Sequence, residues 1–137
     1  MDEAARRLMQ VSTIPVRWGD MDAYAHVNNT VYFRYCEQAR VEWVEGMGFM
    51  VHASAVEGPV VVSAACTFLV PVTYPATVRV EMYAGQPGRS SVMTWYELYV
   101  EGSAERVAEG SAKLVWMNHE TAKSVPLPEE LRRVLTA

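Results

Sequence analysis

The segment from Arg17 to Arg40, RWGDMDAYAHVNNTVYFRYCEQAR, constrains the fold more than any other part of the chain. It begins with strand-like residues, continues through a polar loop and ends in an amphipathic pattern. From Asn29 onwards, and beyond the end of this segment, apolar residues recur at spacings of three and four, the period of one helix face, at Tyr32, Cys36, Ala39, Trp43 and Met47. The pattern predicts a helix over Asn29–Met47 that is about 27 Å long, which suits the span of one small sheet.

The start of this helix is a candidate place for chemistry. Asn28 or Asn29 can act as the N-cap, and Gly46 and Gly48 are natural stops. First-turn amides have no partner within the helix, and the helix dipole adds partial positive charge there. Such an end binds an anion, or a carbonyl oxygen on which negative charge develops. A carboxylate on the loop before the helix can face the same space and supply a base or nucleophile.

The rest of the chain predicts mainly strands. Residues 1–10 are expected to form a loose or weakly helical lead-in, and Val11–Trp18 the first strand, where Pro15 favours an edge position. An irregular connection over Phe49–Glu57 is expected to close at Gly58-Pro59. Further strands are predicted over Val60–Val70, Thr77–Ala84, Ser91–Glu101 and Arg106–Met117, then a polar exit over Asn118–Val125 and a short helix opened by Pro128.

One long helix against one antiparallel sheet is an α+β layer arrangement, and residues 1–137 are interpreted as a single domain. The run Val60–Val70 is apolar on both faces, so we expect the helix on one face and another subunit on the other. Aromatic residues fall on both faces of the later strands, at Trp95, Tyr96, Tyr99 and Trp116. A homodimer or homotetramer is therefore expected.

Composition excludes several classes of protein. Half of the residues are hydrophobic and the formal net charge is −4, which favours a folded domain and argues against general nucleic-acid binding. No apolar run approaches 18 residues, so no membrane span is expected, and the N-terminus lacks the apolar core of a secretory signal. Two cysteines, read as buried free thiols, and three scattered histidines give no zinc-ligand spacing. These features predict a cytoplasmic protein without a metal.

The loop and helix start, WGDMDAYAHVNNTVYFRYCEQAR, resemble the opening motif of hotdog-fold acyl-CoA thioesterases of the 4-hydroxybenzoyl-CoA thioesterase type. That motif reads D-x-D-x-x-G-H-V-N-N before a long helix that carries E-x-x-R. Weaker matches extend the resemblance over nearly the whole chain: FLVP near Pro71, GRSS at 88–91 and PLPEEL at 126–131. The chain departs from the family at Ala25, where glycine is usual, and at Tyr74-Pro75-Ala76, where a Gly-Asp pair often opens the next strand.

The resemblance implies a hotdog fold, in which a five-stranded antiparallel sheet wraps one helix, and roles for several residues. Asp22 corresponds to the catalytic carboxylate, and the amide near Asn29 to the group that polarises the thioester carbonyl. It also favours contact of Arg89, Ser90 and Ser91 with the phosphates of coenzyme A.

Other polar residues of the segment have plainer interpretations. Asp20 is expected to be structural. His26 either fixes the loop or contacts substrate, and Tyr32 belongs to the apolar face unless it binds substrate. Glu37 and Arg40, three residues apart on the helix, are read as a solvated ion pair.

The implied activity is hydrolysis of an acyl-CoA thioester to free acid and coenzyme A. Asp22 would act as nucleophile or as general base, an alternative that the sequence leaves open. Coenzyme A belongs to the substrate, and no other cofactor is expected. The main alternative is a hotdog protein that binds an acyl-CoA or acyl-carrier thioester without hydrolysing it. A third interpretation is a related dehydratase that uses His26 with Asp22.

Overall fold

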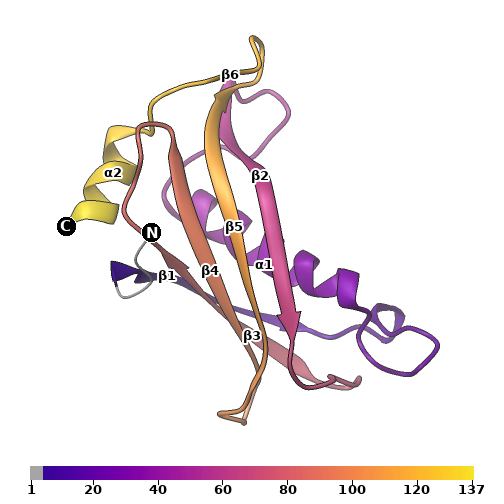
Figure 1. Cartoon of the computed structure of the whole chain (residues 1–137). Helices are drawn as coiled ribbons and strands as arrows, with labels where there is room; N and C mark the ends of the chain where they lie inside the picture. Colours follow the sequence, from indigo (N-terminus) through magenta and orange to yellow (C-terminus); the bar gives the residue numbers. More distant parts are fainter. Residues whose placement is uncertain (1–4) are drawn as a thin grey trace.

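The computed structural model describes residues 5–137, in which one long helix lies across one antiparallel sheet (Figure 1). The strand order is β1-β3-β4-β5-β2, and a sixth strand of two residues, β6, pairs with β5. This confirms the predicted α+β hotdog arrangement. The strands are β1 (Arg7–Pro15), β2 (Glu57–Phe68), β3 (Thr77–Ala84), β4 (Ser91–Val100), β5 (Arg106–Asn118) and β6 (Lys123–Ser124); the helices are α1 (Asn29–Gly46), α2 (Glu129–Thr136) and the 3₁₀ turn η2 (Trp18–Asp20).

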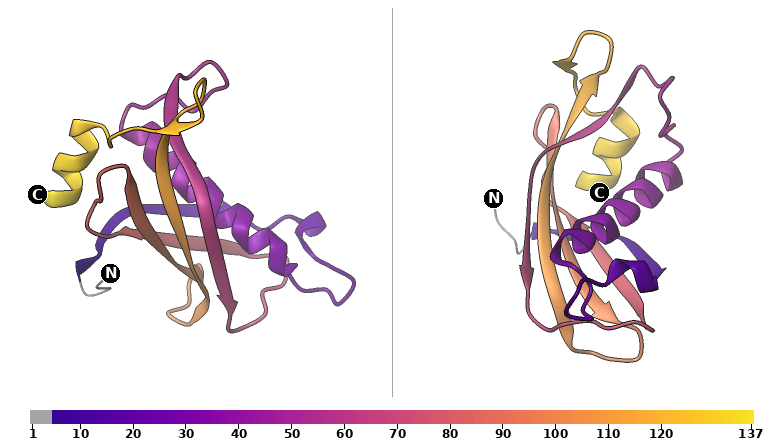
Figure 2. Two further views of the ribbon diagram at one scale, coloured as in Figure 1. Left: turned by 45° about the horizontal axis from the view of Figure 1, so that its top comes forward. Right: turned by 90° about the vertical axis from the view of Figure 1, so that its right-hand side faces the viewer.

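The long helix α1 forms where the apolar period predicts it. The Asn28 side chain caps it by accepting from the Thr30 amide at 3.0 Å, and Gly48 follows its end with φ of +90°. Both helices lie on the same side of the sheet (Figure 2). α1 packs mainly against β1 and β3 and only lightly against β2. Its buried residues are Tyr32, Tyr35, Cys36, Ala39, Trp43 and Val44.

Alternation along β3 divides the sheet into two faces, as predicted. Val78, Val80 and Met82 are fully buried beneath α1, whereas Arg79, Glu81 and Tyr83 point to the other face and are half-buried. The predicted turn between the last two long strands and the predicted C-terminal helix are also present. Glu101 and Gly102 form the turn between β4 and β5, and Pro128 opens α2, as its N-cap rather than its first residue.

The first strand differs from the prediction at both ends. It begins at Arg7, within the segment expected to be loose, because Arg7 and Leu8 pair with the end of β3 at Ala84 and Tyr83. It ends at Pro15, and Trp18 belongs to η2 instead. The expected edge position is confirmed, since β1 pairs only with β3. Residues 1–4 of the predicted lead-in lie outside the described part of the chain.

The other edge strand, β2, also corrects the prediction. Gly58 and Pro59 do not close the connection but lie inside β2, opposite Met117 and Trp116 of β5. An edge strand tolerates this proline because its missing N–H is not needed for a second neighbour. The strand ends at Phe68, and the amides of Leu69 and Val70 both donate to the Val107 carbonyl. Much of β2 is exposed, with Val62 at 52% and Phe68 at 44%.

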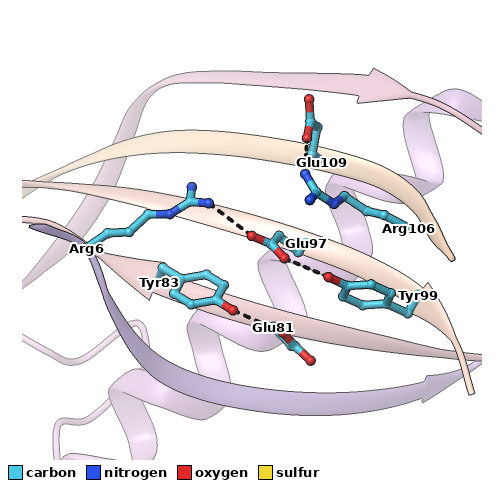
Figure 3. A network of polar contacts seen from close by, with 7 residues as sticks. All are labelled: Arg6, Glu81, Tyr83, Glu97, Tyr99, Arg106 and Glu109. Carbon is cyan, nitrogen blue, oxygen red and sulfur yellow. Dashed lines mark hydrogen bonds and ion pairs between the residues drawn. The ribbon is translucent and has the colours of Figure 1, made fainter. Parts of the chain in front are cut away.

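The face of the sheet opposite α1 carries charged and aromatic residues that are paired with one another (Figure 3). Glu97 accepts from Arg6 at 3.0 Å and from the Tyr99 hydroxyl at 2.7 Å, and Tyr83 donates to Glu81 at 3.0 Å. Arg6 also lies over the ring of Trp95, which is 9% exposed. Trp95 is thus largely covered within one chain, and the expected homodimer or homotetramer stays a prediction.

Candidate active site

The loop before α1 is held by its own backbone. The Asp22 amide donates to the His26 carbonyl at 2.9 Å, the Ala25 amide to the Asp22 carbonyl at 3.0 Å, and the Asn28 amide to the Asp20 carbonyl at 3.0 Å. Val27 is buried and its amide donates to the Val72 carbonyl at 2.8 Å, which ties the loop to the chain that precedes β3. The turn requires φ of +60° at Ala25, the position where the related motif has glycine.

The carboxylate of Asp22 is only partly saturated by this loop. Its Oδ1 accepts from the Tyr24 amide at 2.9 Å, and its Oδ2 lies 3.4 Å from the Asn28 side-chain nitrogen. The second distance is long for a hydrogen bond, so Oδ2 keeps acceptor capacity for another group. The side chain of Asp22 is half-buried and lines a cavity.

The amide of Asn29 is free to bind that same group. Among residues 5–137 it has no hydrogen-bond acceptor, whereas the next amide, that of Thr30, is taken up by the Asn28 cap. It opens α1, so the helix dipole adds positive character to it. It is the group expected to hold an oxygen that gains negative charge.

Asp22 and Asn29 line one cavity of about 310 Å³ together with His26 and Tyr32, all four of which were candidate site residues. The residues on one side of the cavity therefore carry a carboxylate, a helix amide without an acceptor and an imidazole. Burial raises the pKa of Tyr32, so its hydroxyl stays protonated and neutral at ordinary pH. This is a combination able to bind and attack a polarised carbonyl.

The other side of the cavity is apolar, and we did not predict its role from the sequence. It is formed by Phe68, Leu69, Val70 and Pro71, just beyond the end of β2. The ring of Phe68 lies 5.2 Å from that of Tyr32, centroid to centroid. The FLVP run was a weak family match, but apolar residues at a strand end carry no signal of their own for a binding wall.

Asp20 has the structural role that was expected for it. One of its oxygens accepts from the Arg17 amide and from the Tyr35 hydroxyl, both at 2.9 Å. The guanidinium of Arg17 also lies near this carboxylate, with its Nε 3.8 Å from the other oxygen. Burial, and next the hydrogen bond to Asp20, raise the pKa of Tyr35, so this hydroxyl remains a donor. Asp20 thereby joins η2 to the middle of α1.

His26 and the hairpin residues have different settings. The His26 carbonyl closes the loop, and the residue is exposed and lines the cavity. Arg89, Ser90 and Ser91 are not among the cavity residues. They lie at the other end of the sheet, beside α2, where the Arg89 carbonyl accepts from the Leu127 amide and from the Arg132 guanidinium (Figure 1). One chain alone does not bring them to Asp22.

The predicted helix ion pair and the predicted free cysteines have opposite outcomes. The expected Glu37–Arg40 ion pair is wrong, because Glu37 pairs with Arg34 at 3.2 Å and Arg40 reaches inward to the Tyr96 hydroxyl at 3.3 Å. The two cysteines are free thiols, as predicted, with Cys36 buried and Cys66 half-buried. In the described residues no group of three or more His, Cys, Asp or Glu side chains is arranged to hold a metal ion.

None of the helices in the described residues has the length and apolar character needed to cross a membrane.

A comparison with curated proteins found no match. The model of the thioesterase-like superfamily matches residues 16–135.

Solved structures resemble the chain over most of its length. The protein PA2801 of Pseudomonas aeruginosa, described as a thioesterase candidate, is 46% identical, with a TM-score of 0.90 over 94% of this chain and 99% of that one. A DHNA-CoA thioesterase from Staphylococcus aureus shares the fold at 20% identity, with a TM-score of 0.83 over 93% and 91%. Slr0204, a 1,4-dihydroxy-2-naphthoyl-CoA thioesterase from Synechocystis, does so at 18%, with a TM-score of 0.84 over 93% and 95%. With a family model that matches nearly its whole length, this chain belongs to the thioesterase-like superfamily.

Proposed function

We propose that this protein hydrolyses acyl-CoA thioesters to a free acid and coenzyme A. The observation that carries the proposal is the cavity of about 310 Å³ that Asp22 and Asn29 both line, since Asp22 has spare acceptor capacity and the Asn29 amide has no acceptor in the described residues. Family membership supports thioester hydrolysis, and the names of two structural relatives include a CoA thioester.

In the proposed reaction the thioester carbonyl oxygen accepts from the Asn29 amide. As the carbonyl carbon becomes tetrahedral, negative charge grows on this oxygen, and a pre-oriented amide at a helix start stabilises it. Asp22 then acts in one of two ways. It attacks the carbonyl carbon and expels the thiolate of coenzyme A, giving a mixed anhydride that water hydrolyses, or it removes a proton from the water that attacks.

The remaining candidate residues take part in binding. His26 and Tyr32 border the same space, and the apolar Phe68 side chain offers contact area for the arm or the acyl group. In this proposal the acyl group runs beside α1 and the coenzyme A arm lies between two subunits of a homo-oligomer. Arg89, Ser90 and Ser91 of the second subunit are then the candidates for phosphate contact.

The test is thiol release from a panel of short, medium, long and aromatic acyl-CoA substrates, followed with a thiol reagent. We expect turnover of at least one class, at a rate that is proportional to enzyme concentration. Saturable binding of acyl-CoA without thiol release across the whole panel would instead identify the non-hydrolytic binding protein. Hydration of an enoyl-CoA without thiol release would identify the dehydratase.

A further inference from the structure

A second and larger cavity, of about 430 Å³, lies at the other end of the space between α1 and β2. α1 contributes Arg40, Val41 and Val44 to it, and β2 contributes Pro59 and Val61. The cavity beside Asp22 is bordered by the same two elements, through Tyr32 and Phe68. Both cavities therefore belong to one layer of the molecule, between the helix and the edge strand.

Between the two cavities α1 meets β2 at Cys66, whose thiol contacts that of Cys36, and leaves the neighbouring part of the strand uncovered. Ala64 pairs with the buried Ala112, so its side chain is on the helix side of the sheet, yet it is exposed. Cys66, two residues further along the same face, is only half-buried. An extended chain that starts at the thioester position would pass along the exposed side of the Cys36–Cys66 contact to reach the second cavity.

Arg40 borders this second cavity and has no ionic partner. In the described part of the chain it forms no ion pair with a carboxylate, although the arginines on the far face of the sheet, Arg6, Arg79 and Arg106, all do. Its guanidinium carbon lies 5.6 Å from the centroid of the Tyr96 ring, and Nη1 donates to the Tyr96 hydroxyl at 3.3 Å. A half-buried arginine with one neutral contact keeps several donors for a ligand.

The rest of the lining favours an anion attached to an apolar body. His52 and His119 also border the cavity, and its one carboxylate, that of Glu37, is already paired with Arg34. Apolar side chains form most of the remaining wall, namely Val41, Val44, Met50, Val51, Pro59, Val61 and Leu114. A coenzyme phosphate would gain little from such a wall, whereas an acyl chain that ends in a carboxylate would use both the wall and Arg40.

Resting on the proposed thioesterase activity, we propose that this cavity binds the far end of the acyl group and that Arg40 binds a carboxylate there. The substrates are then coenzyme A thioesters of medium-length dicarboxylic acids. Arg40 lies about 16 Å along the helix axis from Asn29, and its side chain points back towards the helix start. An extended chain gains roughly 1.2 Å per bond, so acyl groups of about eight to ten carbons fit the gap.

The test compares matched substrates: suberoyl-CoA, with a terminal carboxylate, and octanoyl-CoA, of the same length without one. For Arg40→Met we expect the ratio of kcat/KM for suberoyl-CoA to kcat/KM for octanoyl-CoA to fall about tenfold or more, since a charge-assisted hydrogen bond is lost. Arg40→Lys keeps the charge but not the forked geometry, so its ratio should lie between those of the unchanged protein and Arg40→Met. Arg133→Met, which removes an exposed arginine of α2 outside both cavities, is the matched control and should leave the ratio unchanged.

A binding measurement separates failure of this inference from failure of the thioesterase proposal. Calorimetric titration of the full chain with free suberate and free octanoate needs no turnover. We expect suberate to bind more tightly than octanoate, and Arg40→Met to remove that preference, even if no acyl-CoA is hydrolysed. An unchanged preference would overturn the inference. A second result would also overturn it: Arg40→Met lowers kcat/KM equally for suberoyl-CoA and octanoyl-CoA but not for the corresponding pantetheine thioesters. Arg40 would then bind a coenzyme phosphate.

Discussion

Two aspartates lie shortly before α1, Asp20 at the end of η2 and Asp22 in the following loop, and their carboxylates have different hydrogen-bond partners. Asp20 accepts from a backbone amide and from the Tyr35 hydroxyl, with the Arg17 guanidinium beside it. Asp22 accepts one well-formed hydrogen bond, its second oxygen has only a long contact to Asn28, and the residue lines a cavity. The comparison teaches that a carboxylate whose oxygens are occupied by the protein holds the fold. One with an unoccupied oxygen facing a cavity next to a bare amide is available for chemistry.

The largest expected effect comes from removing the charge of each aspartate in turn. Asp22→Asn should lower kcat for acyl-CoA hydrolysis roughly 100- to 10,000-fold, because a neutral amide neither attacks nor accepts the proton. The melting temperature should barely change, since the amide oxygen can still accept from the Tyr24 amide. Asp20→Asn is the matched variant and should retain most of the activity. A kcat for Asp22→Asn near that of the unchanged protein would remove the catalytic assignment.

The second effect reverses the comparison and concerns stability. Asp20→Ala should lower the free energy of unfolding by about 2–3 kcal/mol, because it leaves the buried Tyr35 hydroxyl without an acceptor. Urea denaturation measures the change. Tyr35→Phe removes the same hydrogen bond from the other side, so the double variant should lose less than the two single losses combined. Additive losses would mean that the two groups do not act together.

A smaller effect is expected at the residue between the loop and the helix. Asn28→Ala should cost about 1 kcal/mol of stability, since the Thr30 amide loses its cap. Asn28→Asp keeps a capping oxygen but replaces the amide nitrogen near Asp22 with a second carboxylate. It should therefore preserve the melting temperature while lowering kcat/KM. If both variants changed activity and stability in parallel, cap and catalytic positioning would not be separable at this residue.

The smallest effect is a gain. Ala25→Gly should raise the free energy of unfolding by about 0.5 kcal/mol, because the steric strain relieved at the φ of +60° exceeds the greater chain entropy that glycine loses on folding. Ala122, at φ of +56°, is a second position of the same kind far from the site, and Ala122→Gly should also stabilise. Thermal unfolding of both variants checks the sign. A loss of stability at position 25 alone would contradict the geometry of the loop.

Several features were predictable because a local physical rule decides them. The apolar period defines α1, the capping preference leads to Asn28, and strict alternation defines β3 from Thr77 to Ala84. These signals are contained within a few neighbouring residues. The helix start indicated where chemistry could lie, and the resemblance to the thioesterase motif pointed to Asp22 and Asn29, which both line one cavity.

Other features depend on contacts between distant segments and left no local signal. β1 begins at Arg7 because β3 is long enough to pair there, and Pro59 enters β2 because that strand is at an edge. The spacing of three residues predicted an ion pair between Glu37 and Arg40. Arg34, three residues before Glu37, forms that ion pair instead. Arg89 follows the end of β3, whereas the start of β3 pairs with Pro15 near the loop that holds Asp22, so the two residues are separated by the length of this strand.

The most direct measurement is a crystal structure of Asp22→Asn with an intact acyl-CoA bound. We predict that the thioester carbonyl oxygen lies about 3 Å from the Asn29 amide nitrogen. We also predict that its carbonyl carbon is within about 3.5 Å of the residue-22 side chain, or one water away from it. A thioester bound outside this cavity, or one whose carbonyl oxygen points away from the start of α1, would contradict the account.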